Sequence, residues 1–243
     1  MLFSRQSSRP KPVPSLFLHI QKTAGSSFIE VARQYYGNSL TSHGDCWGHL
    51  PEEFKDVRFV SGHIGYDFAK QLMTERFSFT FLRNPIERIL SMYFFCRSRN
   101  PDEFMIYRRA NQLDLEGFLQ AGMTDPWVKK SIWNNQVWQL AHGYAHLDSR
   151  TINEFSEGEL LSLAQEHLEK FTYIGFTETI DADGPAIFSA LGIPSVSAMP
   201  RVNIALPRAT AAGLSSNVIA MLDELTVLDR QLYDYAWQRY SRH

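Results

Sequence analysis

One stretch of ten residues, His19–Phe28 (HIQKTAGSSF), constrains the fold of this chain more than any other. It follows an apolar run, Ser15–Ile20, that is typical of a buried strand, and it leads into Ser26–Tyr36, which has the pattern of a helix. A strand, a tight turn and a helix in that order leave unpaired backbone N–H groups at the helix start, where they bind anions. The stretch therefore predicts a phosphate-binding turn in an α/β fold.

The residues of this turn suit an anion. Gly25 lets the backbone close around a phosphate, the neighbouring serines offer hydroxyl donors, and Lys22 adds a full positive charge. We expect the whole turn to hold the phosphate: Lys22, Thr23, Ala24, Gly25, Ser26 and Ser27. A nucleoside triphosphate loop has its glycine ahead of its lysine, whereas here Gly25 follows Lys22. An ordinary turn with a surface lysine is the alternative.

A second motif follows the β-prone run Phe77–Leu82 (FSFTFL). Asn84 has the properties of an N-cap and Pro85 suits the first helical position, so a helix is expected to begin there. Glu87 stands where a capping box needs an acid, and we interpret it as a capping residue. Arg88 is interpreted as one member of a surface ion pair.

Arg83 stands at the end of the predicted strand, and Ser91 lies eight residues further along, on the predicted helix. Open α/β sheets bind ligands at the carboxyl ends of their strands, and an arginine offers a planar fork to phosphate. We therefore expect Arg83 to act in binding.

Together the two motifs resemble those of the sulfotransferases that use 3′-phosphoadenosine 5′-phosphosulfate (PAPS). The turn is similar to H-I-x-K-T-A-G-[ST]-S, the 5′-phosphosulfate loop of the heparan and uronyl 2-O-sulfotransferase branch. Arg83–Ser91 resembles the 3′-phosphate site, R-[DN]-P-x-E-R-x-x-S. The resemblance implies a P-loop-like sulfotransferase fold, PAPS as the sulfate donor, and Arg83 and Ser91 as ligands of its 3′-phosphate.

His63 lies just beyond a third short strand, Arg58–Ser61. The 2-O-sulfotransferases have two catalytic histidines, H-G-H, in the matching stretch, and this chain has Ser61 in place of the first. The resemblance implies that His63 is the base which takes the proton of the acceptor hydroxyl, and that Lys22 stabilises the leaving oxygen. No metal is expected to take part.

The remaining sequence predicts a single α/β domain over residues 15–243, with a mostly parallel sheet flanked by helices, behind a polar tail over residues 1–14. Ile174–Glu178 (IGFTE) resembles a V-G-x-[TS]-E signature of the family. Further helices are expected at Asp114–Ala121, Pro126–His142, Ser156–Lys170 and Thr179–Leu191, with a strand at Tyr173–Gly175. A last helix, Leu214–Tyr240, has a core stripe at helical spacing: Leu222, Leu225, Leu228, Leu232 and Tyr235.

The segment Gly192–Gly213 is long for a loop in a compact domain, and such loops are usually functional. The resemblance implies a loop that closes over the nucleotide, in which Arg201 or Arg208 contacts the 3′-phosphate. Solvated arginines on a linker are the equal alternative.

The acceptor is the part of the function on which the sequence is least informative. A net charge of −2 gives no support for nucleic acid as a partner. Several basic residues follow the second motif: Arg97, Arg99, Arg108, Arg109, Lys129 and Lys130. They could line a cleft for an acidic acceptor, or they could form an ordinary solvated face. Aromatic residues are plentiful in the same region: Tyr93, Phe94, Phe95, Trp127, Trp133 and Trp138. Sugar rings stack on such side chains, although we expect most of these six in the core. A carbohydrate or a small hydroxylated metabolite is the expected acceptor, and the oligomeric state is not predicted.

One rival constellation is His43, Cys46 and His49, which could ligate a metal, although zinc ligands are ordinarily spaced as tighter pairs. A glycine-punctuated acceptor loop is the preferred interpretation. The two cysteines, Cys46 and Cys96, are too few for a disulfide framework and are expected to be free thiols. With no signal peptide and no membrane-spanning run, the sequence predicts a soluble, cytoplasmic enzyme, and we expect a bacterial one.

Two other functions compete with an O-sulfotransferase. The first is a nucleotide kinase, for which the turn has the wrong order and no magnesium-binding carboxylate follows a strand as expected. The second is a nucleotide-binding module without catalytic activity, which the replacement of the first histidine by Ser61 keeps open.

Overall fold

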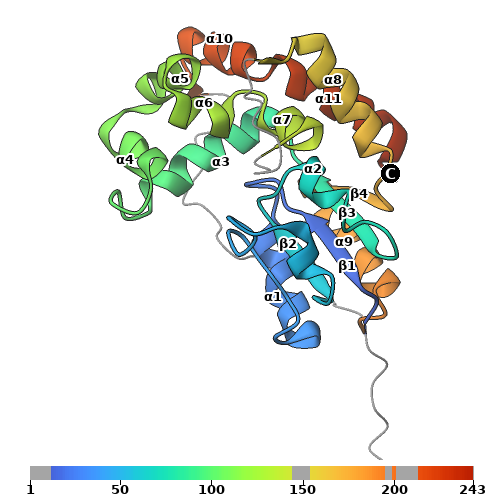
Figure 1. Ribbon diagram of the computed structural model, residues 1–243. Coiled ribbons are helices and arrows are strands. Elements are labelled where there is room, and N and C mark those ends of the chain that lie inside the picture. The colour runs from blue at the N-terminus through green and yellow to red at the C-terminus, as the bar shows by residue number, and fades with distance from the viewer. Residues whose placement is uncertain (1–11, 144–153, 195–198, 201–212, 243) are drawn as a thin grey trace, which may run out of the picture.

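Four parallel strands form the centre of the computed structural model, which describes residues 12–143, 154–194, 199–200 and 213–242 (Figure 1). Their order in the sheet is β2-β1-β3-β4. The strands are β1 (Ser15–Leu18), β2 (Phe59–Gly62), β3 (Phe77–Leu82) and β4 (Tyr173–Phe176). The predicted α/β class, with a parallel sheet flanked by helices, is therefore confirmed.

Helices cover both faces of this sheet and extend beyond one end of it as a helical part of the molecule (Figure 1). They are α1 (Gly25–Tyr36), α2 (Tyr66–Ala69), α3 (Pro85–Arg97), α4 (Met105–Gln112), α5 (Leu115–Thr124), α6 (Pro126–Ile132), α7 (Asn135–Ala141), α8 (Glu157–Leu168), α9 (Ile180–Ala190), α10 (Ser216–Leu225) and α11 (Val227–Tyr240). Short 3-10 turns lie at Pro51–Phe54 and Thr177–Thr179.

The order of the strands brings the two predicted phosphate motifs together. The chain runs from β1 outward to β2, then crosses back to β3 on the other side of β1. Leu18 pairs with Thr80, so the turn that begins at His19 and the end of β3 at Arg83 lie at the same edge of the sheet. Such a switch in strand order leaves a crevice at the carboxyl ends, where α/β sheets bind ligands.

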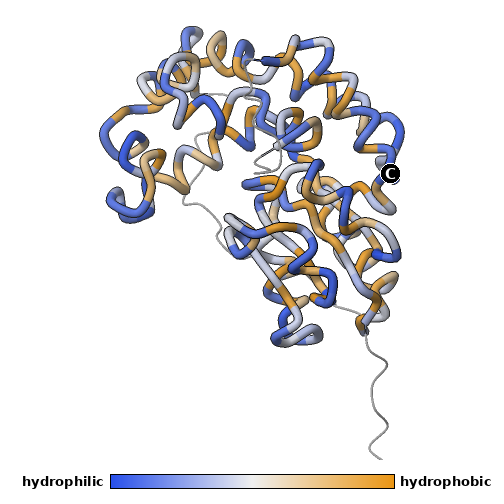
Figure 2. The backbone as a smooth tube through the Cα atoms, viewed as in Figure 1, coloured by the Kyte–Doolittle hydropathy of each residue, from blue (hydrophilic) through white to orange (hydrophobic). Residues whose placement is uncertain are grey.

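Alternate residues of the strands enter two different cores, as the pleat of a strand requires. Phe17, Phe79 and Phe81 pack with α1 and α9 on one face. Leu16 and Leu18 pack on the other face with α2, α7, α8 and α11. Because both faces are covered, the strands are mostly apolar, as the orange tube segments at the centre of Figure 2 show. Their polar residues, Ser15, Ser61, Ser78 and Thr80, are buried as well. A third core lies within the helical part, among α3, α5, α6 and α10.

Two predicted long helices are each broken into two, and the two breaks stabilise each other. Pro126–His142 is interrupted at Asn134, which has a left-handed backbone (φ 39°), and Leu214–Tyr240 at Thr226. The side chain of Asn134 accepts the N–H groups of Leu228 and Asp229 at the start of α11. The Asp229 carboxylate in turn accepts two N–H groups at the start of α7. Tertiary hydrogen bonds thus replace the helical ones that the periodicity predicted.

The predicted stripe of the last segment is only partly core. Its leucines are buried in two different cores, with Leu222 and Leu225 in one and Leu228 and Leu232 in the other. Tyr235 is half-buried instead, and its hydroxyl bonds to Glu169.

Parts of the predicted tail and loop lie outside the described residues. Arg201 and Arg208, proposed for the closing loop, are among them, as are residues 1–11. The end of the predicted tail is attached to the domain, because the Val13 N–H donates to the Leu191 carbonyl and the Tyr36 hydroxyl donates to the Val13 carbonyl. Within the described part of the chain, no helix combines the length and apolarity needed to cross a membrane.

Candidate active site

The turn between β1 and α1 leaves the start of α1 free for a ligand. Lys22 and Ala24 both have left-handed backbones, with φ of 69° and 67°. No side chain caps the helix, which would ordinarily satisfy its first N–H groups. Left-handed residues other than glycine are strained and concentrate at functional sites. The turn therefore has a strained backbone and leaves the start of α1 uncapped, an arrangement that suits an anion.

Gly25 is required by the packing under this turn. A Cβ atom at this position would lie 2.0 Å from Nε2 of His19, so no other residue fits. The His19 ring is buried, stacks on Phe17 with ring centroids 5.2 Å apart, and supports the turn from below. Thr23 also acts internally, because its hydroxyl donates to the Ile20 carbonyl at 2.8 Å. The Thr23 hydroxyl therefore stabilises the turn itself, and the assignment of Thr23 to the phosphate-binding turn stays a prediction.

Arg83 joins the second motif to the first. It is 7% exposed, and its guanidinium donates from Nη1 to the carbonyl oxygen of Lys22 at 3.1 Å. Its Nη2 lies 3.7 Å from the carboxylate of Glu87. Ser91 is half-buried on α3, two turns beyond. Arg83 and Lys22, which are 61 positions apart in sequence, therefore share one wall.

The start of α3 is capped as predicted only in part. The Asn84 side chain accepts the Glu87 N–H at 3.2 Å, and Pro85 is the first helical residue. The Asn84 N–H, however, donates to Glu178, at 2.8 Å, so Glu87 does not complete a capping box. Glu178 belongs to the IGFTE signature, which lies next to the second motif because β4 pairs with β3.

Arg88 corrects a sequence-based interpretation. It is completely buried rather than part of a surface pair, and its guanidinium donates to the carbonyl of Ser131 at 3.1 Å. Its charge also acts on Asp229, which is buried with it. Burial raises the pKa of Asp229 to about 6, although Arg88 and two backbone N–H groups lower it. Arg88 has a structural function between α3, α6 and α11.

Lys22 lies over an aromatic ring at the cavity wall. Its Nζ is 3.7 Å from the centroid of Phe95 on α3, which holds the ammonium group by a cation–π contact. Burial and the nearby charge of Arg83 lower the pKa of Lys22 to about 8. The lysine is therefore protonated at neutral pH but close to losing its proton.

His63 lies in a cluster of three histidines. Its ring centroid is 4.7 Å from that of His19 and 5.6 Å from that of His43. His43 belongs to the stretch for which an acceptor loop was preferred over a metal site. The backbone N–H of His63 donates to the backbone carbonyl of His43 at 2.9 Å. Burial, His43 and Lys22 lower the pKa of His63 to about 3, so its imidazole is neutral.

Gln21 contacts the ring of His63, with its Nε2 and the His63 Nδ1 3.3 Å apart. The amide orientation and the histidine tautomer together set which ring nitrogen is free to accept a proton. With the Gln21 amide nitrogen as the donor, Nδ1 accepts and Nε2 carries the proton, whereas with the amide turned over Nδ1 carries the proton and Nε2 is the free base.

The rival metal constellation is not assembled. The Cys46 thiol is buried and donates toward Thr41 and Ser61, and His49 is exposed and pairs with Glu53 at 3.0 Å. In the residues that the structure describes, no group of three or more His, Cys, Asp or Glu side chains could hold a metal ion. Both cysteines are free and buried, and burial raises the pKa of Cys46 to about 11, so it is not a reactive thiolate.

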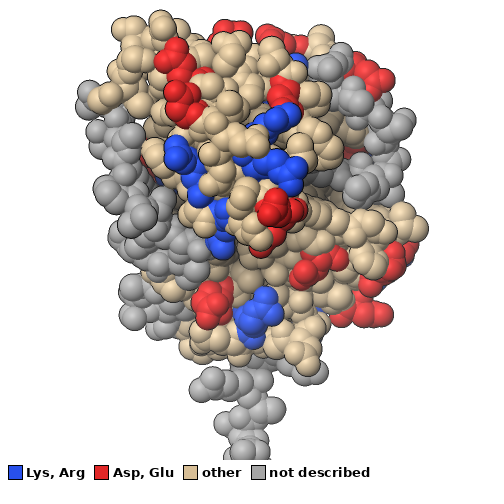
Figure 3. All heavy atoms as spheres, turned by 90° about the vertical axis from the view of Figure 1, so that its left-hand side faces the viewer, with Lys and Arg blue, Asp and Glu red and all other residues tan. Residues whose placement is uncertain are grey.

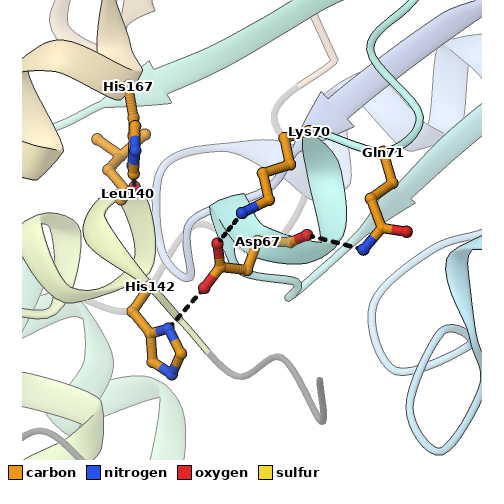
Figure 4. Close-up of polar contacts among 6 residues, drawn as sticks. All are labelled: Asp67, Lys70, Gln71, Leu140, His142 and His167. Carbon is orange, nitrogen blue, oxygen red and sulfur yellow. Dashed lines mark hydrogen bonds and ion pairs between the residues drawn. The ribbon is translucent and has the colours of Figure 1, made fainter. Parts of the chain in front are cut away.

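A polar network around Asp67 joins α2, which follows β2, to the end of α7 (Figure 4). Asp67 on α2 accepts a hydrogen bond from Lys70 and lies 2.7 Å from Nδ1 of the buried His142. Burial would raise the pKa of Asp67, but these two partners outweigh it and lower the pKa. Gly65 packs so closely on the His142 carbonyl that a Cβ would lie 1.9 Å away. The chain beyond His63 is thus held against the end of α7.

Two glutamines of α7 form hydrogen bonds with the backbone at the ends of three strands. Neither belongs to a motif predicted from the sequence. Gln136 forms a pair of hydrogen bonds with Arg83, accepting its N–H at 3.0 Å and donating to its carbonyl at 2.9 Å. Gln139 donates to the carbonyls of His19, at 3.0 Å, and Ile64, at 2.8 Å. Residues three apart lie on the same helix face. Two buried amides in the otherwise apolar run QVWQLA were the available signal.

These elements enclose one cavity of about 1060 Å³ at the carboxyl edge of the sheet. All of the predicted site residues line it except Thr23. Of the basic residues after the second motif, Arg99 and Lys130 line it, whereas Arg108 and Arg109 pair with acids on the surface. Lys and Arg side chains gather near the middle of the face on the α4 side of the molecule, with Asp and Glu around them (Figure 3).

Comparison with known families identifies the class of enzyme. A family model described as the sulfotransferase family matches residues 14–241. This match spans nearly the whole chain, so the chain belongs to the sulfotransferase family and is an enzyme that transfers a sulfuryl group. No match was found among curated proteins.

Proposed function

We propose that this enzyme transfers the sulfuryl group of PAPS to a hydroxyl of a carbohydrate or another small acceptor, with His63 as the base. The observation that carries the proposal is the contact between Arg83 and the Lys22 carbonyl. It joins the turn that resembles a 5′-phosphosulfate loop to the motif that resembles a 3′-phosphate site. One doubly phosphorylated adenosine would then contact both motifs.

The residues of the cavity suit this donor. The uncapped start of α1, with Ser26 and Ser27, would hold the 5′-phosphosulfate, because a helix N-terminus favours negative charge. Arg83 and Ser91 would hold the 3′-phosphate. The cavity volume of about 1060 Å³ leaves room for an acceptor beside the nucleotide. When bound, the donor supplies a sulfuryl group that is already activated for transfer.

His63 would take the proton from the acceptor hydroxyl as its oxygen forms a bond to sulfur and the bond from sulfur to the 5′-phosphate oxygen breaks. General-base catalysis of this kind is typically worth about 10²–10⁴-fold. A base must be unprotonated, and the lowered pKa of His63 ensures this in the free enzyme. Anionic groups in the cavity would raise that pKa toward neutrality and strengthen the base.

Lys22 would stabilise the negative charge on the departing oxygen, together with the N–H groups at the start of α1. Positioning and charge stabilisation supply most of the acceleration in the related phosphoryl transfers. Phe95 keeps the ammonium group of Lys22 at the cavity wall.

A thermal-shift comparison tests the donor. Adenosine 3′,5′-bisphosphate at a hundred times its Kd should stabilise the fold by about 2.7 kcal/mol. For a chain of this size we expect the Tm to rise by about 5–11 °C. ATP with magnesium should raise the Tm far less. Equal shifts would favour the kinase alternative over the proposed donor.

The base is tested by the variant His63→Ala. We expect it to lower kcat for transfer of labelled sulfate from PAPS by about 10²–10⁴-fold while the Kd for adenosine 3′,5′-bisphosphate stays the same. His49→Ala is the matched control, because His49 is exposed and does not line the cavity. Normal turnover by His63→Ala would refute the base assignment, and nucleotide binding without transfer by the unmodified enzyme would indicate a non-catalytic module.

A further inference from the structure

Three aromatic residues that line the cavity are exposed, although aromatic residues are ordinarily buried: Trp47 at 44%, Phe104 at 49% and Trp127 at 51%. Lys130 lies over the Trp127 ring, which leaves Trp47 and Phe104 as exposed rings without a basic side chain over them in the described part of the chain. Keeping a large apolar ring in water forgoes the free energy of burying it, about 25 cal/mol for each Å². Neither ring belongs to a hydrophobic core of the described residues, so both are available to pack against a ligand.

The two rings come from different parts of the chain and pack against each other, and Trp47 also lies next to His63. Trp47 comes from the segment between α1 and β2, and Phe104 from the residue that precedes α4. Their centroids are 6.4 Å apart and their planes are at 89°, so they form a corner. The Trp47 ring centroid is also 6.4 Å from that of His63.

Neighbouring contacts hold both rings in place. The Trp47 ring packs on Gly44, where a Cβ would lie 3.2 Å from it, and its indole N–H points to the His63 carbonyl at 3.5 Å. Phe104 packs edge-to-face on Tyr107, with centroids 5.1 Å apart. The corner is therefore set before any ligand arrives.

The charges around the aromatic residues of the cavity divide them into two groups. Phe95 carries Lys22 and Arg99 over its ring, at 3.7 and 4.4 Å, and Trp127 carries Lys130 at 4.0 Å. Over Trp47 and Phe104, the described part of the chain places no Lys or Arg side chain. The first group offers positive charge to anions, whereas the second offers only apolar ring surface.

From this arrangement we infer that Trp47 and Phe104 form the acceptor subsite, and that it takes an uncharged hydroxylated ring. The flat face of such a ring stacks against the corner while a hydroxyl at its edge reaches His63. Pyranose sugars and phenols share this chemistry. The inference rests on the proposed function and adds the acceptor class to it.

Transfer of labelled sulfate from PAPS to three kinds of acceptor tests the inference: a neutral methyl glycoside series, a substituted phenol series, and the matching uronic acids. We expect label on neutral rings in preference to uronates, and the first two arms distinguish a sugar from a phenol. Trp47→Ala and Phe104→Ala should each raise the acceptor KM by about two- to thirteenfold, the range typical of losing one aromatic contact. Trp47→Phe should restore most of the affinity.

Leu50→Ala is the matched control, because Leu50 is an exposed apolar residue of the same segment that does not line the cavity. It should leave the acceptor KM unchanged. All variants should keep the Tm rise with adenosine 3′,5′-bisphosphate, which shows that they fold and bind nucleotide. Labelling that prefers uronates, or a KM that neither ring affects, would overturn the inference and leave the proposed function standing. Loss of the nucleotide-induced shift in the unmodified enzyme would instead refute the proposed function.

Discussion

The proposed reaction and the burial of Lys22 favour opposite charge states of its amine. The proposed reaction needs its positive charge, whereas burial in the cavity wall favours the neutral amine and lowers the pKa to about 8. The charged form is retained because the Phe95 ring and the surrounding polar groups replace part of the lost water. In the proposed reaction, Lys22 would therefore stabilise the leaving group only within a limited pH range.

This conflict predicts the pH dependence of catalysis. The Lys22 amine carries its positive charge only below its pKa of about 8. We therefore expect kcat/KM for PAPS to fall as the pH rises through about 8 in the unmodified enzyme. Lys22→Arg should move this fall beyond the measurable range, because a guanidinium stays protonated. The measurement is kcat/KM for PAPS between about pH 6 and 10. An unchanged alkaline fall in Lys22→Arg would show that another group titrates.

Helix α7 matters to the site although none of its residues lines the cavity. Its side chains are buried throughout, yet two of them are amides that hydrogen-bond to backbone at the strand ends. Such bonds have a fixed length and direction, which apolar contacts lack. The helix therefore sets the relative positions of the turn, the segment after His63, and Arg83.

Replacing Gln136 tests this positioning. Gln136→Leu leaves the N–H and carbonyl of Arg83 without partners, so we expect the free energy of unfolding to fall by about 1–3 kcal/mol. The Kd for adenosine 3′,5′-bisphosphate should rise as well, because Arg83 is no longer held. Gln120→Leu, on the exposed side of α5, is the control. A loss of stability with an unchanged Kd would mean that Gln136 has only a structural function.

At the scale of the molecule, a buried charged pair lies where several helices meet. Arg88 comes from α3 and Asp229 from α11, and their hydrogen bonds reach the end of α6 and the start of α7. Removing one partner of a buried pair leaves the other charge without compensation. The packing of α3, α6, α7 and α11 therefore depends on both Arg88 and Asp229.

We expect Arg88→Met to lower the free energy of unfolding by about 3–5 kcal/mol at pH 8, measured by urea denaturation. The loss should be smaller at pH 5. Burial already raises the pKa of Asp229 from 3.8 to about 6, and loss of Arg88 raises it further. The folded state then binds a proton more tightly than the unfolded state, so lowering the pH stabilises it. Adding Asp229→Asn should recover part of the loss, and an equal loss at both pH values would contradict this account.

The features that the sequence predicted well are those with short-range causes. The strand before the turn, the helix after it, and the start of α3 at Asn84 depend on residues within a few positions of each other. Arg88 was misjudged because its burial depends on Asp229, near the other end of the chain. The breaks at Asn134 and Thr226 were missed for the same reason, since each break is stabilised by side chains or backbone of the other.

The sequence by itself determined the uncapped turn before α1 and the start of α3 after Arg83, because order and spacing along the chain encode these local structures. Only the tertiary structure decided that Arg83 meets the Lys22 carbonyl and that His43 joins His63. It also decided that Gln136 holds Arg83. These contacts follow from strand order and helix packing, which are set by apolar burial summed over the whole chain rather than by any one motif.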